Sequence, residues 1–186
     1  RSLEKARAFC RVRVAAKASL VPLHFDRSGD LSAQILAVRP DIIVDASGPF
    51  QDYGQDQYKL IEACIAHKIH YFDLADGSGF VKGVAAFDSA ARAAGVFVLS
   101  GVSSFPVLTA SVVRHLSADM TRVHAIRGGI APSPYAGVGT NVIRAIARYA
   151  GQKISLTRAG KTEKAWPLTS ALRYTIAPPG FVPLKN

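Results

Sequence analysis

The chain has 186 residues, of which 49% are hydrophobic, and a formal net charge of +10. This apolar content excludes a disordered chain, and no apolar run reaches the ~18 residues that a membrane span requires. The length suits one α/β domain followed by part of another.

The positive charge raises the question of nucleic-acid binding. The Lys and Arg residues are scattered along the chain, however, with no basic run and no aromatic interleaving. A nucleic-acid surface concentrates its charge on one face, so we expect no nucleic-acid partner. A positive field that attracts a phosphorylated cofactor or an acidic substrate explains the charge as well.

The first two thirds of the chain alternate between helical and extended patterns. Ser2 is placed to cap the first helix, Pro40 to stop the second, and Gly95 to close the fourth in a left-handed conformation. The patterns predict helices over 2–10, 28–39, 53–69, 80–95 and 106–118, and strands over 18–26, 41–47, 70–75 and 96–102.

This alternation with short connections predicts βαβ units, and hence a Rossmann-like, doubly wound parallel sheet with helices on both faces. The apolar run at 41–47 is typical of a strand that is buried on both faces. We place the boundary of this dinucleotide-binding domain at residue 119, and assign 120–186 to part of a smaller α+β substrate or dimerisation domain. In that second region we expect a strand at 121–133, a helix at 137–151 and antiparallel strands beyond it.

Metal binding is not indicated by the Cys and His residues. Cys10 and Cys64 lie in separate apolar helical patterns without metal-ligand spacing, and the five His residues are dispersed. We interpret the cysteines as core thiols of a protein in a reducing, cytoplasmic compartment.

Small, polar or acidic residues follow each strand that we predict. In an open α/β sheet a ligand binds in the crevice beyond the carboxyl ends of the strands, and Gly lets another molecule approach the backbone closely. A ligand at this edge and ordinary turn chemistry are both open interpretations. The residues concerned are Asp26 and Arg27, Ser47 to Phe50, Asp73 to Gly77, and Gly101 to Ser104.

The acidic residues of this edge have two interpretations each. Asp26 either accepts hydrogen bonds from a ligand or forms an Asx-type turn with Ser28 and Gly29. Asp73 and Asp76 are either an acid/base pair or residues that fasten a turn and cap a helix.

The stretch DIIVDASGPFQDYGQDQYKLIEACIAHKIHYFDLAD resembles the saccharopine dehydrogenase-like family of NAD(P)-binding oxidoreductases. The similarity extends over roughly residues 1–118, and the dinucleotide fingerprint GxGxxG is absent from the chain. The motifs that carry the resemblance are Gly48-Pro49-Phe50, Tyr53-Gly54, Ala63-Cys64, Tyr71-Phe72-Asp73-Leu74, and Gly101 with Pro106.

The resemblance implies roles for individual residues. Arg1, next to Ser2, would pair with the 2′-phosphate of NADP, and Asp26 would lie beside the adenine. The turn Ser47-Gly48-Pro49 would line the path from pyrophosphate to nicotinamide, with Phe50 held outside the strand as a wall near the ring. Gly101 completes the cofactor-binding residues that the resemblance implies.

The catalytic side is less defined. Asp73, Asp76 and Tyr53 are the candidates for proton transfer, and Asp73 to Asp76 would face the substrate. The family more often has Gly-Glu where this chain has Ala75-Asp76, so the resemblance leaves the small-molecule substrate open, together with the choice between NADP and NAD.

The chain begins at Arg1, which we interpret as a position just after a Gly-rich phosphate loop in a longer protein. On that interpretation the 186 residues alone would bind a dinucleotide weakly, because the helix N-terminus that holds the pyrophosphate is missing. We therefore predict an NAD(P)-dependent oxidoreductase, with a homodimer compatible with the second domain. The alternative is a non-catalytic, Rossmann-like module that senses a nucleotide or binds another protein.

Overall fold

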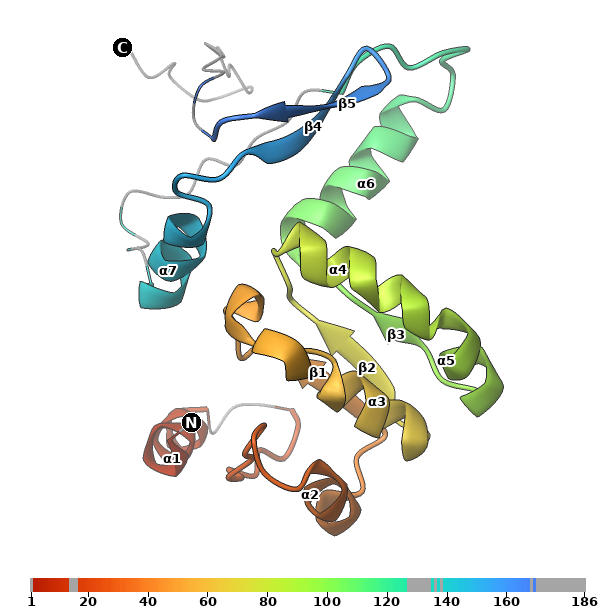
Figure 1. Ribbon diagram of the computed structural model, residues 1–186. Coiled ribbons are helices and arrows are strands. Elements are labelled where there is room, and N and C mark those ends of the chain that lie inside the picture. The colour runs from red at the N-terminus through yellow and green to blue at the C-terminus, as the bar shows by residue number, and fades with distance from the viewer. Residues whose placement is uncertain are drawn as a thin grey trace. The chain divides into compact units, whose positions relative to one another are not determined.

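The computed structural model describes residues 2–13, 17–126, 135, 137, 139–167 and 169 (Figure 1). By its contacts the chain divides into two compact units, Arg1–Asp119 and Met120–Asn186. The assignment of these units to a dinucleotide-binding and a substrate domain stays a prediction. Among the helices that the structure describes, none is long and apolar enough to cross a membrane.

The first unit is built around a parallel sheet of three strands in the order β1-β2-β3. β1 pairs with β2 from Ile42 opposite His70 to Asp45 opposite Asp73, and β2 pairs with β3 at two positions. This unit is therefore a mixed α/β fold with a parallel sheet. The strands are β1 Ile42–Asp45, β2 His70–Asp73 and β3 Val98–Leu99.

The helices of the first unit follow the predicted order. Two 3₁₀ turns follow β1, and the single helix predicted over 80–95 is divided into α4, η3 and α5. They are α1 Leu3–Arg11, α2 Leu31–Val38, η1 Phe50–Asp52, η2 Gly54–Asp56, α3 Lys59–Ala66, α4 Ser78–Val84, η3 Ala85–Phe87, α5 Asp88–Ala94 and α6 Ser104–Leu116.

Local chemistry sets several of these helix ends. The Ser2 hydroxyl accepts a hydrogen bond from the Lys5 amide at the start of α1, and Asp30 caps α2 in the same way. Arg39, before Pro40, ends α2 in a left-handed conformation, and Gly95 ends α5 at φ 72°. These caps confirm the predicted stops at Pro40 and Gly95.

The core lies on one face of the sheet. Side chains from α2, α3 and α4 pack with Tyr71 of β2, and Figure 1 shows α3, α4 and α5 on the near side of the strands. On the other face Ile42 and Val44 are 47% and 59% exposed. The prediction of a β1 strand buried on both faces is therefore wrong, because no described side chain covers that second face closely enough to bury them.

The predicted strand at 18–26 is also absent. Residues 19–26 run without regular structure up to a turn at Arg27. A strand exists only when its backbone pairs with a neighbour, and the described residues offer this segment no ladder. Pro22 removes one backbone donor besides.

The Cys64 thiol lies at the centre of the core, fully buried on α3. Burial, together with the nearby Asp45 carboxylate, raises the pKa of this thiol from 9.0 to about 12. Cys10, on α1, is only partly buried.

We expect iodoacetamide to alkylate Cys10 and to leave Cys64 unmodified in the folded protein at pH 9, as read by mass spectrometry of peptides. The folded state keeps the Cys64 proton while the unfolded chain loses it near pH 9, so this thiol makes stability fall between pH 9 and about 12. Equal labelling of both thiols in native protein would contradict the packing of α3.

The second unit contains a helix and a β-hairpin. Its described elements are α7 Thr140–Arg148, β4 Ile154–Arg158 and β5 Lys161–Ala165. The two strands pair antiparallel from Ile154 opposite Ala165 to Arg158 opposite Lys161, which confirms the predicted antiparallel strands. Residues 121–126 form no strand, and the rest of the strand predicted at 121–133 lies outside the described residues.

Candidate functional site

The carboxyl ends of the three parallel strands lie side by side. The Leu74 amide donates to the Asp45 carbonyl, and the Val102 amide donates to the Asp73 carbonyl at 2.8 Å. The residues that follow β1, β2 and β3 therefore gather at one edge of the sheet, as the parallel topology predicts.

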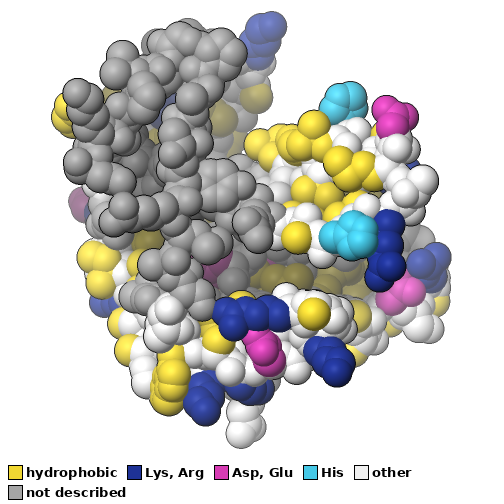
Figure 2. All heavy atoms as spheres, turned by 90° about the horizontal axis from the view of Figure 1, so that it is seen from above, with side chains coloured by type: hydrophobic (Ala, Val, Ile, Leu, Met, Phe, Trp, Pro, Cys, Tyr) yellow, Lys and Arg dark blue, Asp and Glu magenta, His cyan; other side chains and the backbone are white. Residues whose placement is uncertain are grey.

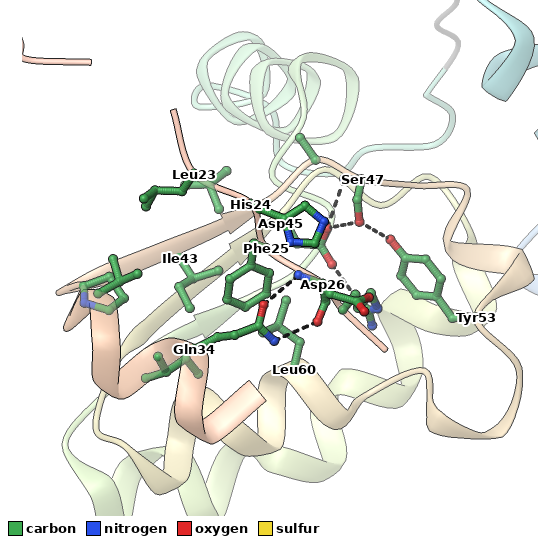
Figure 3. Close-up of a pocket in the computed structure, with 16 residues that line it drawn as sticks. Leu23, His24, Phe25, Asp26, Gln34, Ile43, Asp45, Ser47, Tyr53 and Leu60 are labelled. Carbon is green, nitrogen blue, oxygen red and sulfur yellow. Dashed lines mark hydrogen bonds and ion pairs between the residues drawn. The ribbon is translucent and has the colours of Figure 1, made fainter. Parts of the chain in front are cut away.

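A cleft of about 680 Å³ opens beside β1 at this edge (Figure 3). Residues 23–27 form one wall, residues 43–47 the other, and α2 and α3 contribute side chains. Figure 3 shows Phe25, Ile43 and Leu60 gathered in an apolar part, and Asp45, Ser47 and Tyr53 at a polar end. The cleft thus has two chemically different parts.

A connected network of four side chains forms the polar end. Arg27 donates to Asp45 Oδ2 at 2.6 Å, and Ser47 donates through its amide and its hydroxyl to Asp45 Oδ1. The Ser47 and Tyr53 hydroxyl oxygens lie 2.7 Å apart. Because the Ser47 proton is directed to Asp45, Tyr53 is the donor in this last hydrogen bond.

Arg27 connects this network to the chain around it. Its guanidinium lies 3.6 Å from the centre of the Tyr53 ring, as in a cation–π contact, and it donates a second hydrogen bond to the Gln57 carbonyl. The side chain of Asp45 is only 3% exposed. A carboxylate so deeply buried requires a hydrogen-bonded cationic partner, and Arg27 is that partner.

Asp26 stands at the rim of the same cleft. Its Oδ1 accepts from the Ser28 amide, and its backbone exchanges hydrogen bonds with the Gln34 side chain. The interpretation as an Asx-type turn is therefore confirmed. The residue is exposed, and its second carboxylate oxygen, Oδ2, lies beside Gly29.

Asp73 does not lie in the cleft. It is fully buried, and its Oδ1 accepts hydrogen bonds from the amides of Ala75 and Gly101 and from the Ser100 hydroxyl. Gly101 has φ 71°, a conformation that favours glycine. This carboxylate therefore holds the end of β2 to the loop after β3. The arrangement agrees with the interpretation of Asp73 as a residue that fastens a turn.

Two buried polar atoms beside this fastening have no hydrogen-bond partner among the described residues: Asp73 Oδ2 and the Tyr71 hydroxyl. Burial, followed by the Asp73 and Asp45 carboxylates, raises the pKa of the Tyr71 hydroxyl above its ordinary value. Tyr71 therefore stays neutral over the physiological pH range.

Asp76 is exposed and accepts a hydrogen bond from the Gln51 side chain at 2.9 Å. Gly77, the next residue, packs against the same Gln51 side chain. A Cβ added at this glycine would lie 3.2 Å from Gln51 Nε2. The structure thus separates Asp73 and Asp76, the first inside the fold and the second on its surface.

The expectation that Phe50 stands outside the strand as an open wall is wrong. Phe50 is 4% exposed and packs edge-on against Tyr53 and at a tilt against Phe80. The turn of Gly48 and Pro49 directs the ring inward, where burial of an aromatic side chain stabilises the core. Gly48, Pro49 and Phe50 are not among the residues that line the cleft.

Of the remaining predicted cofactor residues, Ser2 caps α1 and is not among those that line the cleft. Arg1 lies outside the described residues. The structure therefore brings Asp26, Ser47 and Tyr53 together at the cleft. The other predicted residues that the structure describes do not line it: Ser2, Gly48, Pro49, Phe50, Asp73, Asp76 and Gly101.

The sequence analysis placed Arg27 at the ligand edge without a partner and gave no role to Asp45, although the two form the centre of the polar end. Asp45 carried a sequence signal for an ion pair: a carboxylate at the end of a buried, apolar strand needs a cationic or hydrogen-bonding partner. Which cation supplies it could not be read from the chain, because Arg27 lies 18 residues away.

Basic side chains elsewhere are dispersed. Figure 2 shows Lys and Arg at separate places on the visible surface, several of them beside Asp, Glu or His side chains. In the part of the chain that the structure describes, no group of His, Cys, Asp and Glu could hold a metal ion.

The fold and the site define a mixed α/β protein with a two-part cleft at the carboxyl edge of a parallel sheet. In comparisons with known proteins, no protein-family model matches the chain, and no curated protein matches it significantly.

Proposed function

We propose that the chain belongs to an NAD(P)-dependent oxidoreductase of the saccharopine dehydrogenase-like type, with a Rossmann-like first domain. The observation that supports this is the common edge at which the three strand ends meet, with the cleft of Asp26, Ser47 and Tyr53 beside it. Ligands of open α/β sheets bind at such an edge.

The residues present fit the sugar portion of a dinucleotide better than its phosphates. The exposed Asp26 carboxylate can accept hydrogen bonds from ribose hydroxyls. Arg27, the cation of the cleft, is paired with Asp45 and Gln57. In this proposal Asp26 orients a ribose, and the Ser47 and Tyr53 hydroxyls line the path toward the reacting ring.

The cofactor supplies hydride transfer when it is bound. Of the three proton-transfer candidates, the proposal uses Tyr53, because its hydroxyl lines the cleft and is held by Ser47. Asp73 is buried, and its Oδ1 already accepts three hydrogen bonds. Those from Ser100 and Gly101 hold the loop after β3 in place. Asp76, paired with Gln51, lies on the surface.

A second candidate is a non-catalytic module that binds another protein. The exposed apolar residues Ile42, Val44 and Leu99 on the uncovered face of the sheet favour it, since large exposed apolar patches mark interaction sites. An absence of any nucleotide binding would favour this candidate over the oxidoreductase.

The test uses the complete gene product and the change in NADPH fluorescence on binding, with NADH in a parallel titration. We expect binding, and we expect Asp26→Ala to weaken it ~10-fold, because a hydrogen bond to a charged group contributes ~1.5–3 kcal/mol. Asp88→Ala is the matched control, since Asp88 pairs with Arg92 on the surface of α5. Wild-type protein that binds neither nucleotide would refute the proposal.

A further inference from the structure

A short ladder of hydrogen bonds holds β3 to β2. In the described sheet the two strands pair at two positions, Tyr71 opposite Val98 and Phe72 opposite Leu99. At the carboxyl end of this ladder, the loop after β3 donates three further hydrogen bonds to Asp73. The amino end of β3 therefore needs a contact of its own to stay beside β2.

An imidazole supplies that contact. The Phe97 amide donates a hydrogen bond to His70 Nδ1 at 3.2 Å, and the Phe97 carbonyl accepts one from the Tyr71 amide. Both backbone groups of Phe97 thus point toward β2. Because β2 begins at His70, the side chain of this residue stands where a longer strand would offer a backbone acceptor. The two rings also stack, with their centres 3.9 Å apart and their planes at 9°.

The hydrogen bond defines where the proton of the imidazole lies. A ring nitrogen that accepts from an amide carries no proton, so the neutral ring has its proton on Nε2. In the charged ring both nitrogens are donors, and the Nδ1–H of His70 would then face the N–H of Phe97. His is the side chain whose charge ordinarily changes between pH 5 and 8. The contact at the amino end of β3 therefore requires the neutral ring.

Charged groups from other segments share an opening with His70. The direct neighbours of the ring on β1 and β3, Ile42 and Phe97, are uncharged. The opening is lined by one carboxylate, two permanent cations and a second imidazole: Asp41, Arg39, Lys68 and His67. Of these, His67 titrates over the same pH range as His70, so a test must distinguish the two imidazoles.

We propose that His70 is a pH-sensitive latch between β2 and the start of β3, closed when the ring is neutral and open when Nδ1 is protonated. Opening removes the acceptor of the Phe97 amide and leaves the hydrogen bonds to Asp73 in place. The ring contact persists, because an aromatic face also accepts a cation. The closed latch uses the neutral ring alone, so its contribution is present at pH 8 and lost toward pH 5. The latch does not depend on the proposed oxidoreductase activity.

The test measures hydrogen exchange of the complete gene product by mass spectrometry with fragmentation to single residues. Rates at pH 8 and pH 5 are each divided by those of an unfolded peptide of the same sequence, which removes the pH dependence of the exchange chemistry. We expect the protection of the Phe97 amide to fall ~5-fold at pH 5, the factor that one net hydrogen bond contributes. The Val102 amide, which donates to the Asp73 carbonyl, is the internal control and should keep its protection.

Three variants separate the hydrogen bond from the ring contact and from the second imidazole. His70→Asn places an amide oxygen at the position of Nδ1 and does not titrate, so the Phe97 amide should stay protected at both pH values. His70→Phe keeps a ring and removes the acceptor, so protection should be low at both. His67→Gln is the matched control, and it should show the same pH dependence as the wild type.

Two results would overturn the proposal. The first is equal protection of the Phe97 amide at pH 8 and pH 5 in the wild type, which would mean that the proton on His70 does not open the contact. The second is a pH dependence that survives in His70→Asn or disappears in His67→Gln, because the titrating group would then be another one.

Discussion

Replacing Arg27 by Met is expected to lower the free energy of unfolding of the first unit by ~3–5 kcal/mol, the cost of leaving a buried charge without its partner. Asp45 would keep its hydrogen bonds from Ser47 and lose its cation, while its side chain stays only 3% exposed. Met preserves most of the volume of Arg27 and its contact with the Tyr53 ring. Urea unfolding followed by far-ultraviolet circular dichroism measures the change.

The matched control for this variant is the double substitution Arg27→Met with Asp45→Asn. The neutral amide removes the uncompensated charge and can still accept from Ser47, so the double variant should recover at least half of the lost stability. Trp166 lies in the second unit, and its fluorescence monitors that unit separately. A loss below ~1 kcal/mol for Arg27→Met, within the range of exposed pairs, would contradict a buried pair.

Replacing Asp73 by Ala is expected to lower the free energy of unfolding of the first unit by at least ~3 kcal/mol. The substitution leaves the buried amides of Ala75 and Gly101 and the Ser100 hydroxyl without their acceptor, and each such group costs ~1–3 kcal/mol when unsatisfied. The loop after β3 should loosen first, so the Gly101 amide should exchange with solvent faster than those of β2.

Asp73→Asn separates this structural role from proton transfer. The amide keeps an acceptor oxygen for the three donors, so most of the stability should remain. If Asp73 were the proton-transfer group, Asp73→Asn would abolish turnover in a stable protein. Tyr71→Phe is a second control on the same strand, because it keeps the buried ring and removes only the hydroxyl. Burial and the nearby Asp73 carboxylate raise the pKa of that hydroxyl, but it makes no hydrogen bond of good geometry with the described residues, so stability should change by ~1 kcal/mol or less.

These substitutions also test how the candidate site is held together. Arg27 and Asp45 join the segment before α2 to the end of β1, whereas Asp73 joins β2 to the loop after β3. Arg27→Met breaks the first connection, whereas Asp73→Asn keeps an acceptor for the second, so the two variants should differ in their effect on nucleotide binding. We expect Arg27→Met to weaken it, since Tyr53 loses the cation above its ring.

The sequence by itself determined the order of helices and parallel strands. The caps at Ser2 and Gly95 and the 2-residue and 3.6-residue periods are local signals, read within one turn or one strand. The Asx turn at Asp26 could also be proposed from the sequence, because its hydrogen bond spans only two residues. The structure then decided between this turn and the alternative.

Only the tertiary structure decided which polar groups meet. Phe50 became a core residue because Tyr53 and Phe80 offered an aromatic pocket, and no local pattern shows where a distant ring lies. Residues 19–26 have the composition of a strand and remain unpaired, since a strand needs a neighbour that the sequence cannot guarantee. The pairing of Arg27 with Asp45 was hidden for the same reason: contacts between segments depend on how the chain packs as a whole.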